Sequence, residues 1–75
     1  MSLIAHKTLI LGTSRLSRAA EAWHDAARLV WTRWEVFLRA EPETRAFAFA
    51  SYAAALDAEE TAAAAMARLL SSNAA

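Results

Sequence analysis

The sequence has no cysteine and only one glycine and one proline among its 75 residues. The lack of cysteine excludes disulfides, thiolate metal sites and thiol catalysis. So little glycine and proline argues against a turn-rich β-sandwich and against a glycine-rich loop that binds phosphate. Eight Lys and Arg residues balance eight Asp and Glu residues. No excess of charge therefore points to nucleic acid or to an anionic membrane as a partner.

A long hydrophobic run is also missing. The longest stretch without a charge, residues 46–56, is well short of the roughly 20 apolar residues that cross a bilayer. Near the N-terminus, His6 and Lys7 precede a short apolar piece, residues 9–11, which is below the roughly 7–15 residues of a secretory signal. We therefore expect a cytoplasmic protein without a membrane span.

Hydrophobic residues make up 57% of the chain, which excludes a disordered tail. Many of them are alanine, which favours helix but adds little burial energy. A chain of this size buries only about 60% of its unfolded surface and is marginally stable alone. Small domains gain stability from disulfides, a structural metal or a partner subunit. With disulfides excluded, the sequence favours a partner.

Gly12 and Pro42 divide the chain and predict an all-α fold. A Ser or Thr after Gly12 can cap a long first helix. Pro42 suits the first turn of a second helix, where Glu41 and Glu43 are favoured by the helix dipole. The predicted divisions are an N-terminal segment at residues 1–12, which is a short helix or a strand, and a helical hairpin at 13–73, with helices at about 14–40 and 42–71 and a turn at about 41–42. Two long helices joined by a tight turn form an antiparallel hairpin.

Apolar residues of the first helix alternate spacings of four and three without interruption: Leu16, Ala20, Trp23, Ala27, Val30, Trp34 and Phe37. This is the a/d pattern of a coiled coil. In the second helix, apolar residues recur at every seventh position: Phe49, Leu56, Ala63 and Leu70, with Tyr52 and Met66 beside them. We therefore predict an intrachain seam made by Leu16, Trp23, Val30, Trp34, Phe37, Phe49, Leu56 and Met66.

Further apolar residues flank the first helix's seam, with Leu29 and Val36 on one side and Trp31 and Leu38 on the other. The apolar arc is then wider than one neighbouring helix can cover. We expect Leu29, Trp31, Val36 and Leu38 to contact a partner, most simply in a four-helix bundle formed by two hairpins.

Residues 21–24 form a Glu-x-x-His pattern on the first helix. Two such patterns, with one Glu from each of two other helices, build the di-metal site of ferritin-like bundles. In a hairpin, Glu59 or Glu60 could face His24, and a dimer would provide the second half of the site. Against this, Glu21 points away from the seam and the pattern is common by chance. We therefore assign no metal ligand and no cofactor.

Nucleic-acid binding and catalysis find less support. Residues 31–34, Trp-Thr-Arg-Trp, resemble an aromatic and cationic surface for single-stranded nucleic acid, but Trp34 belongs to the seam. No Ser/His/Asp set stands on a strand–turn framework, and a lone hairpin offers few pockets. The sequence thus predicts a non-enzymatic module that associates with itself or with another helical protein. The di-metal site and a small dimer that binds nucleic acid are the alternatives.

Overall fold

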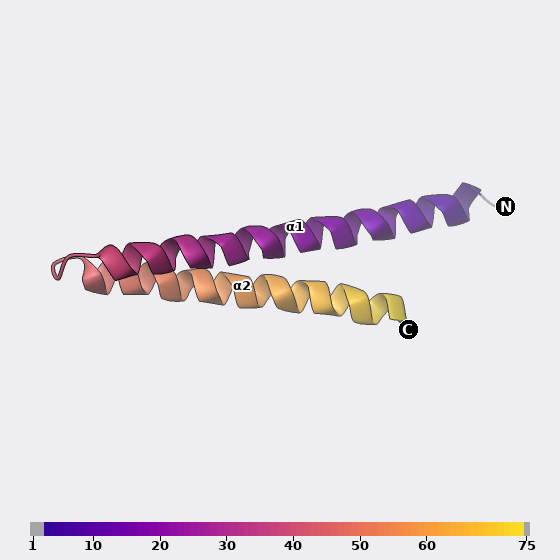
Figure 1. Ribbon diagram of the computed structural model, residues 1–75. Helices are drawn as coiled ribbons and strands as arrows, with labels where there is room; N and C mark the ends of the chain where they lie inside the picture. The colour runs from indigo at the N-terminus through magenta and orange to yellow at the C-terminus, as the bar shows by residue number, and fades with distance from the viewer. Residues whose placement is uncertain (1–2, 75) are drawn as a thin grey trace.

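The computed structural model describes the backbone of residues 3–74 and the side chains of residues 14–72. Within that range it contains helix α1, Leu3–Arg39, and helix α2, Arg45–Ala74, and no strand. The two helices lie antiparallel and pack against each other (Figure 1). The predicted all-α hairpin is therefore confirmed.

Helix α1 continues through Gly12, where the sequence predicted a break. No glycine of the described backbone has a positive φ angle, so Gly12 does not form a left-handed helix cap. A glycine inside a helix costs only about 1 kcal/mol relative to alanine, and the helix-forming residues on both sides compensate for it. Residues 3–12 therefore extend α1 and are not a separate element; residues 1–2 lie outside the described range.

The turn between the helices is closed by backbone hydrogen bonds. The N–H of Thr44 donates to the carbonyl of Glu41 at 3.0 Å, which places Pro42 at the second position of a β-turn, where its fixed φ fits. The N–H of Ala48 donates to the carbonyl of Thr44 at 2.9 Å and so begins α2. Pro42 thus precedes α2. The prediction that it lies in the first turn of the second helix is wrong.

The hairpin is long and thin, with extents of 64 × 18 × 12 Å. Among the side chains described, only Ala48 and Ala55 are buried, and no large one is fully buried. The helices are closest near the turn and diverge toward the chain ends (Figure 1). Two helices alone make one layer of contact, so most side chains keep one side in solvent. Neither helix, as far as it is described, has an apolar stretch that could cross a membrane.

The path of α1 through Gly12 predicts the effect of replacing this glycine. Gly12→Ala should raise the free energy of unfolding by about 0.5–1 kcal/mol, because alanine loses less backbone entropy in a helix. Thermal unfolding followed by circular dichroism, at matched protein concentration, measures the change. A loss of stability would instead indicate a left-handed backbone at this position, as in a helix cap.

Candidate interaction surface

An aromatic cluster near the turn holds the two helices together. The ring of Trp34 lies 5.1 Å from that of Tyr52, and the ring of Phe37 lies 5.7 Å from that of Phe49. Trp34 and Phe37 also contact each other, at 5.5 Å. Aromatic pairs at such separations and tilted angles contribute beyond the area that they bury. These two cross-helix contacts set which residues of α1 and α2 lie at the same level.

The α1 seam residues are all half-buried: Leu16, Ala20, Trp23, Ala27, Val30, Trp34 and Phe37. On α2, the residues with the same three–four spacing that are buried or half-buried are Ala48, Tyr52, Ala55, Glu59, Ala62, Met66 and Leu69. Of the predicted seam residues on α2, Met66 is half-buried, whereas Phe49 and Leu56 are 52% and 38% exposed. Phe49 and Leu56 follow Ala48 and Ala55 directly, so they are rotated about 100° from the line of contact.

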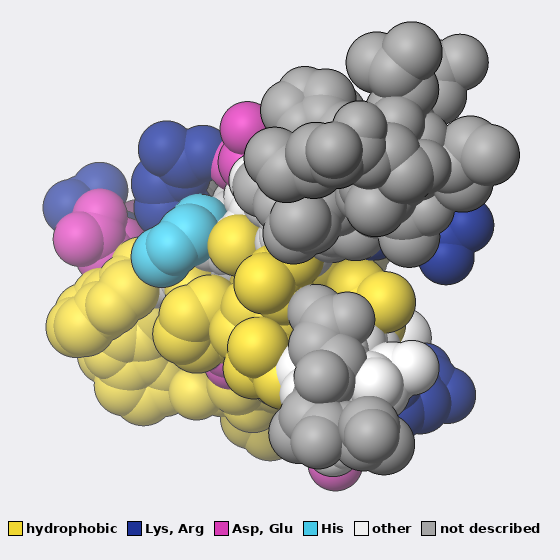
Figure 2. Space-filling model, turned by 90° about the vertical axis from the view of Figure 1, so that its right-hand side faces the viewer, with side chains coloured by type: hydrophobic (Ala, Val, Ile, Leu, Met, Phe, Trp, Pro, Cys, Tyr) yellow, Lys and Arg dark blue, Asp and Glu magenta, His cyan; other side chains and the backbone are white. Residues whose placement is uncertain are grey.

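Trp31, Leu38, Phe49 and Leu56 form one exposed apolar surface, which we call the aromatic face. Their exposed fractions are 67%, 63%, 52% and 38%, in that order. Each of them directly follows a seam residue, and in an antiparallel hairpin the residues that follow the seam on both helices fall on the same side. Figure 2 shows hydrophobic side chains of both helices gathered on one side, with charged side chains at the border.

The aromatic face contains a depression between α1 and α2. Val30, Trp31, Trp34 and Tyr52 line an open depression of about 240 Å³. Trp34 and Tyr52 belong to the cluster that joins the helices, while Trp31 forms an exposed wall. The depression therefore has apolar walls and a base formed by packed aromatic rings, which suits an apolar side chain from a partner.

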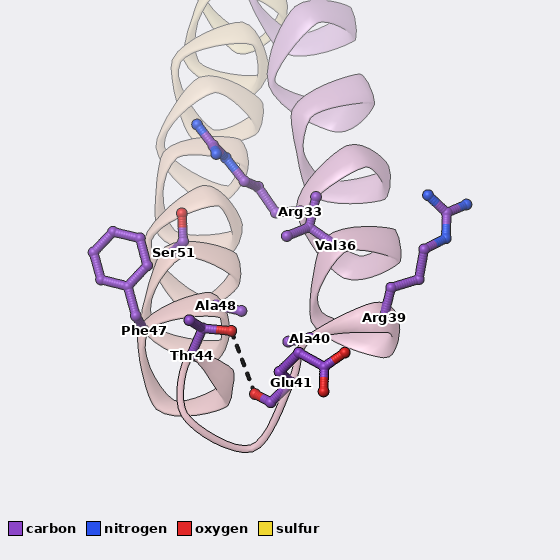
Figure 3. Close-up of a pocket in the computed structure, with 9 residues that line it drawn as sticks. All are labelled: Arg33, Val36, Arg39, Ala40, Glu41, Thr44, Phe47, Ala48 and Ser51. Atoms are coloured by element: carbon purple, nitrogen blue, oxygen red, sulfur yellow. Dashed lines mark hydrogen bonds between the residues drawn. The ribbon is translucent and has the colours of Figure 1, made fainter.

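The opposite flank holds the other two predicted interface residues. Val36 lines a second depression, of about 380 Å³, together with Arg33 of α1 and Phe47 of α2 (Figure 3). Leu29 lies one heptad before Val36 and is 40% exposed. The four residues predicted to contact a partner thus divide between two surfaces, with Trp31 and Leu38 on the aromatic face. No flat partner can touch both flanks at once.

Phe47 is the largest exposed residue that the sequence analysis missed, with 80% of its surface exposed. It directly precedes the buried Ala48, so its side chain is turned away from α1. The signal that would have found it is the three–four spacing that begins at Ala48. Once the alanines are assigned to the seam, Phe47 falls on one flank and Phe49 on the other.

The candidate metal ligands are not brought together within one chain. Glu21, His24 and Glu60 are exposed, and Glu59 is half-buried in the seam. The aromatic contacts place Glu59 at the level of Ala27, nearly one turn from His24, whose ring instead packs on Trp23 at 5.1 Å. No group of three or more His, Asp or Glu side chains in the described part of the chain could hold a metal ion.

The ion pairs of the described residues lie within α1 and do not join the helices. Arg28 pairs with Asp25, and Arg39 pairs with Glu35 at 3.8 Å. All four side chains are more than half exposed, so each pair contributes little to stability. The association of α1 with α2 therefore depends on the apolar seam.

Trp34→Ala tests the aromatic cluster. Removing a buried Trp costs about 3–5 kcal/mol. Because Trp34 is half-buried, we expect the free energy of unfolding to fall by about 2 kcal/mol. Urea unfolding followed by circular dichroism at a fixed protein concentration measures the loss. Phe47→Ala is the matched control and should change stability by less than about 0.5 kcal/mol. Equal effects of the two variants would contradict the assigned seam.

Glu59→Leu tests the carboxylate in the seam. Glu59 belongs to neither ion pair of the described residues, and it is half-buried in the seam. We expect the leucine variant to raise the free energy of unfolding by about 1 kcal/mol, because it adds apolar contact in the seam. Glu60→Leu, at the exposed neighbouring position, should have little effect. Destabilisation by Glu59→Leu would show that the carboxylate has a partner.

Comparison with known proteins does not place the chain in a family. No protein-family model matches the chain, and no curated protein or solved structure is significantly similar to it.

Proposed function

We propose that this protein is a non-catalytic protein–protein association module that pairs with a second copy through the aromatic face to form a four-helix bundle. The observation that carries the proposal is the exposure of Trp31, Leu38, Phe49 and Leu56 on one side of the hairpin. Monomeric proteins rarely expose contiguous apolar patches of more than a few hundred Å². Such a patch, on a hairpin in which no large side chain of residues 14–72 is fully buried, favours a function in association.

The energetics support this use of the face. Full burial of one large apolar side chain contributes about 1.5–3 kcal/mol. The four side chains of the aromatic face are about 40–70% exposed. Burying the exposed part of these side chains on both copies would therefore yield about 7–13 kcal/mol, which is comparable with the roughly 4–15 kcal/mol that association costs. Trp31 is the expected centre of the interface, because large aromatic residues in dry pockets dominate binding energies.

The chemistry of the face also favours docking over catalysis. None of its four residues has an ionisable group, so the face offers no general acid or base. Another protein with an amphipathic helix could use the same surface, because a helix docks in an apolar groove through residues at helical spacing. A second copy is the preferred partner, since every copy presents both the depression and the side chains that can fill it.

Trp31→Ala tests the proposed interface. We expect the dissociation constant of the self-associated protein to rise more than about tenfold, because an exposed tryptophan at the centre of an interface is a typical hot spot. Helix content should stay unchanged, since Trp31 lies outside the intrachain seam. Sedimentation at several micromolar concentrations measures association, and circular dichroism measures helix content.

Phe47→Ala is the matched control for this experiment, because Phe47 is an exposed aromatic residue on the opposite flank. It should change the dissociation constant by less than about twofold. A wild-type chain that stays monomeric and melts cooperatively would overturn the proposal. Equal weakening by both variants would show that the aromatic face is not the specific interface.

A further inference from the structure

We infer that the second copy docks turn to turn, so that the turns of both hairpins lie at the same end of the bundle and α1 of each copy lies along α2 of the other. This inference rests on the proposed function and adds the orientation of the partner. Two observations carry it: the distribution of apolar bulk along the aromatic face, and the charges at its border.

The apolar bulk lies in the half of the hairpin nearest the turn. The contacts of Trp34 with Tyr52 and of Phe37 with Phe49 place Leu38 beside Phe49 and Trp31 beside Leu56. One heptad further from the turn, the same side of α1 and α2 carries His24 and Ala63, and two heptads further it carries Ser17 and Leu70. The face therefore changes from wholly apolar near the turn to partly polar further away, where Leu70 is its one large apolar residue among those described.

Turn-to-turn docking brings the two large apolar halves together. In the inverted arrangement, with the turns at opposite ends, Trp31 and Leu38 would lie over the partner's His24 and the partner's Ser17. Burying an imidazole and a hydroxyl against apolar side chains is unfavourable without hydrogen-bond partners. Turn-to-turn docking instead places Trp31 and Leu38 over the partner's Leu56 and the partner's Phe49, and it leaves His24 and Ser17 toward the end where the two helices diverge.

In this orientation a side chain of the partner also fills the depression on the aromatic face. A two-fold axis along the bundle places α2 of one copy over α1 of the other, and Leu56 lies at about the level of Val30 in the hairpin register. The partner's Leu56 then enters the depression of about 240 Å³ lined by Val30, Trp31, Trp34 and Tyr52. A cavity of about 150 Å³ is enough for a benzene ring, so a leucine side chain fits.

The charges at the border favour the same orientation. Arg28 precedes Trp31 by one helical turn and Glu60 follows Leu56 by one turn, and both are exposed at nearly the same level. With α1 of one copy on α2 of the other, Arg28 faces the partner's Glu60, and the two-fold axis makes this pair twice. In the inverted arrangement α1 lies along the partner's α1, and Arg28 comes next to the partner's Arg28.

The net charges of the helices agree with this pairing. Residues 14–39 of α1 contain five Arg and three Asp or Glu, whereas residues 45–72 of α2 contain two Arg and three Asp or Glu. Contact between α1 and the partner's α2 therefore joins surfaces of opposite net charge, and complementary charges help to fix the orientation of an interface.

Charge reversal tests the pairing. Arg28→Glu and Glu60→Arg should each weaken dimerisation about five- to tenfold in sedimentation, because each replaces two attractive pairs by two repulsive ones. The double variant should return to within about threefold of the wild-type dissociation constant. Arg68→Glu, on the other flank of α2, is the matched control and should have little effect. Weakening without restoration in the double variant would overturn the inferred orientation.

A distance measurement gives a second, independent test. Because the chain has no cysteine, Glu43→Cys places a single spin label in the exposed turn. Turn-to-turn docking predicts about 20 Å between the two labels, which is two helix diameters. Inverted docking separates the turns by most of the length of α2, on the order of 40 Å at 1.5 Å per residue, and a distance of that size would overturn the inference. A wild-type chain that does not dimerise in sedimentation would overturn the proposed function itself.

Discussion

The packing of Trp34 on Tyr52 and of Phe37 on Phe49 is the interaction on which the arrangement of this hairpin depends. These contacts fix the register of α2 on α1, and the register decides which side chains share a side. Once it is set, α2 can cover only part of the circumference of α1. Trp31 and Leu38 then stay exposed, and Phe49 and Leu56 fall beside them because they follow Ala48 and Ala55. Two aromatic contacts near the turn thus determine which residues form the aromatic face.

The seam of α1 could be predicted from the sequence, because its apolar residues, alanines included, keep the three–four spacing from Leu16 to Phe37. The seam of α2 could not be predicted in the same way. There the repeat of large residues marks a flank, while small residues such as Ala48 and Ala55 make the contact. The physical reason is volume: α1 brings Trp and Phe to the interface, and the small side chains of Ala48 and Ala55 let the two helix backbones come close between the aromatic contacts. The spacing of large residues in one helix must therefore be compared with the residues of the helix that it packs against.

The local signals at Gly12 and Pro42 show a second limit of sequence reasoning. Each residue type has more than one suitable setting: glycine ends helices but is also tolerated inside them, and proline suits both the first helical turn and the second position of a β-turn. At Pro42 the hydrogen bond from Thr44 to the carbonyl of Glu41 selects the β-turn. The fold class can be predicted despite these ambiguities, because it depends on the long helices. The residues of the candidate surface could not be predicted in the same way, because they depend on how α2 is rotated about its own axis.

The distribution of bulk along the hairpin separates the formation of the fold from the proposed association. The aromatic cluster lies next to the turn, so its contacts join residues close in sequence and close a short loop, which favours rapid formation. Further from the turn, half-buried positions such as Ala20, Ala27, Ala62 and Ala63 add little burial energy, and the helices diverge there (Figure 1). That half of the molecule has the most to gain from a neighbour that buries more of its surface, although it brings few large side chains to the contact. Under the proposed function, the half near the turn provides the affinity of the dimer, and the alanine-rich half gains stability from it.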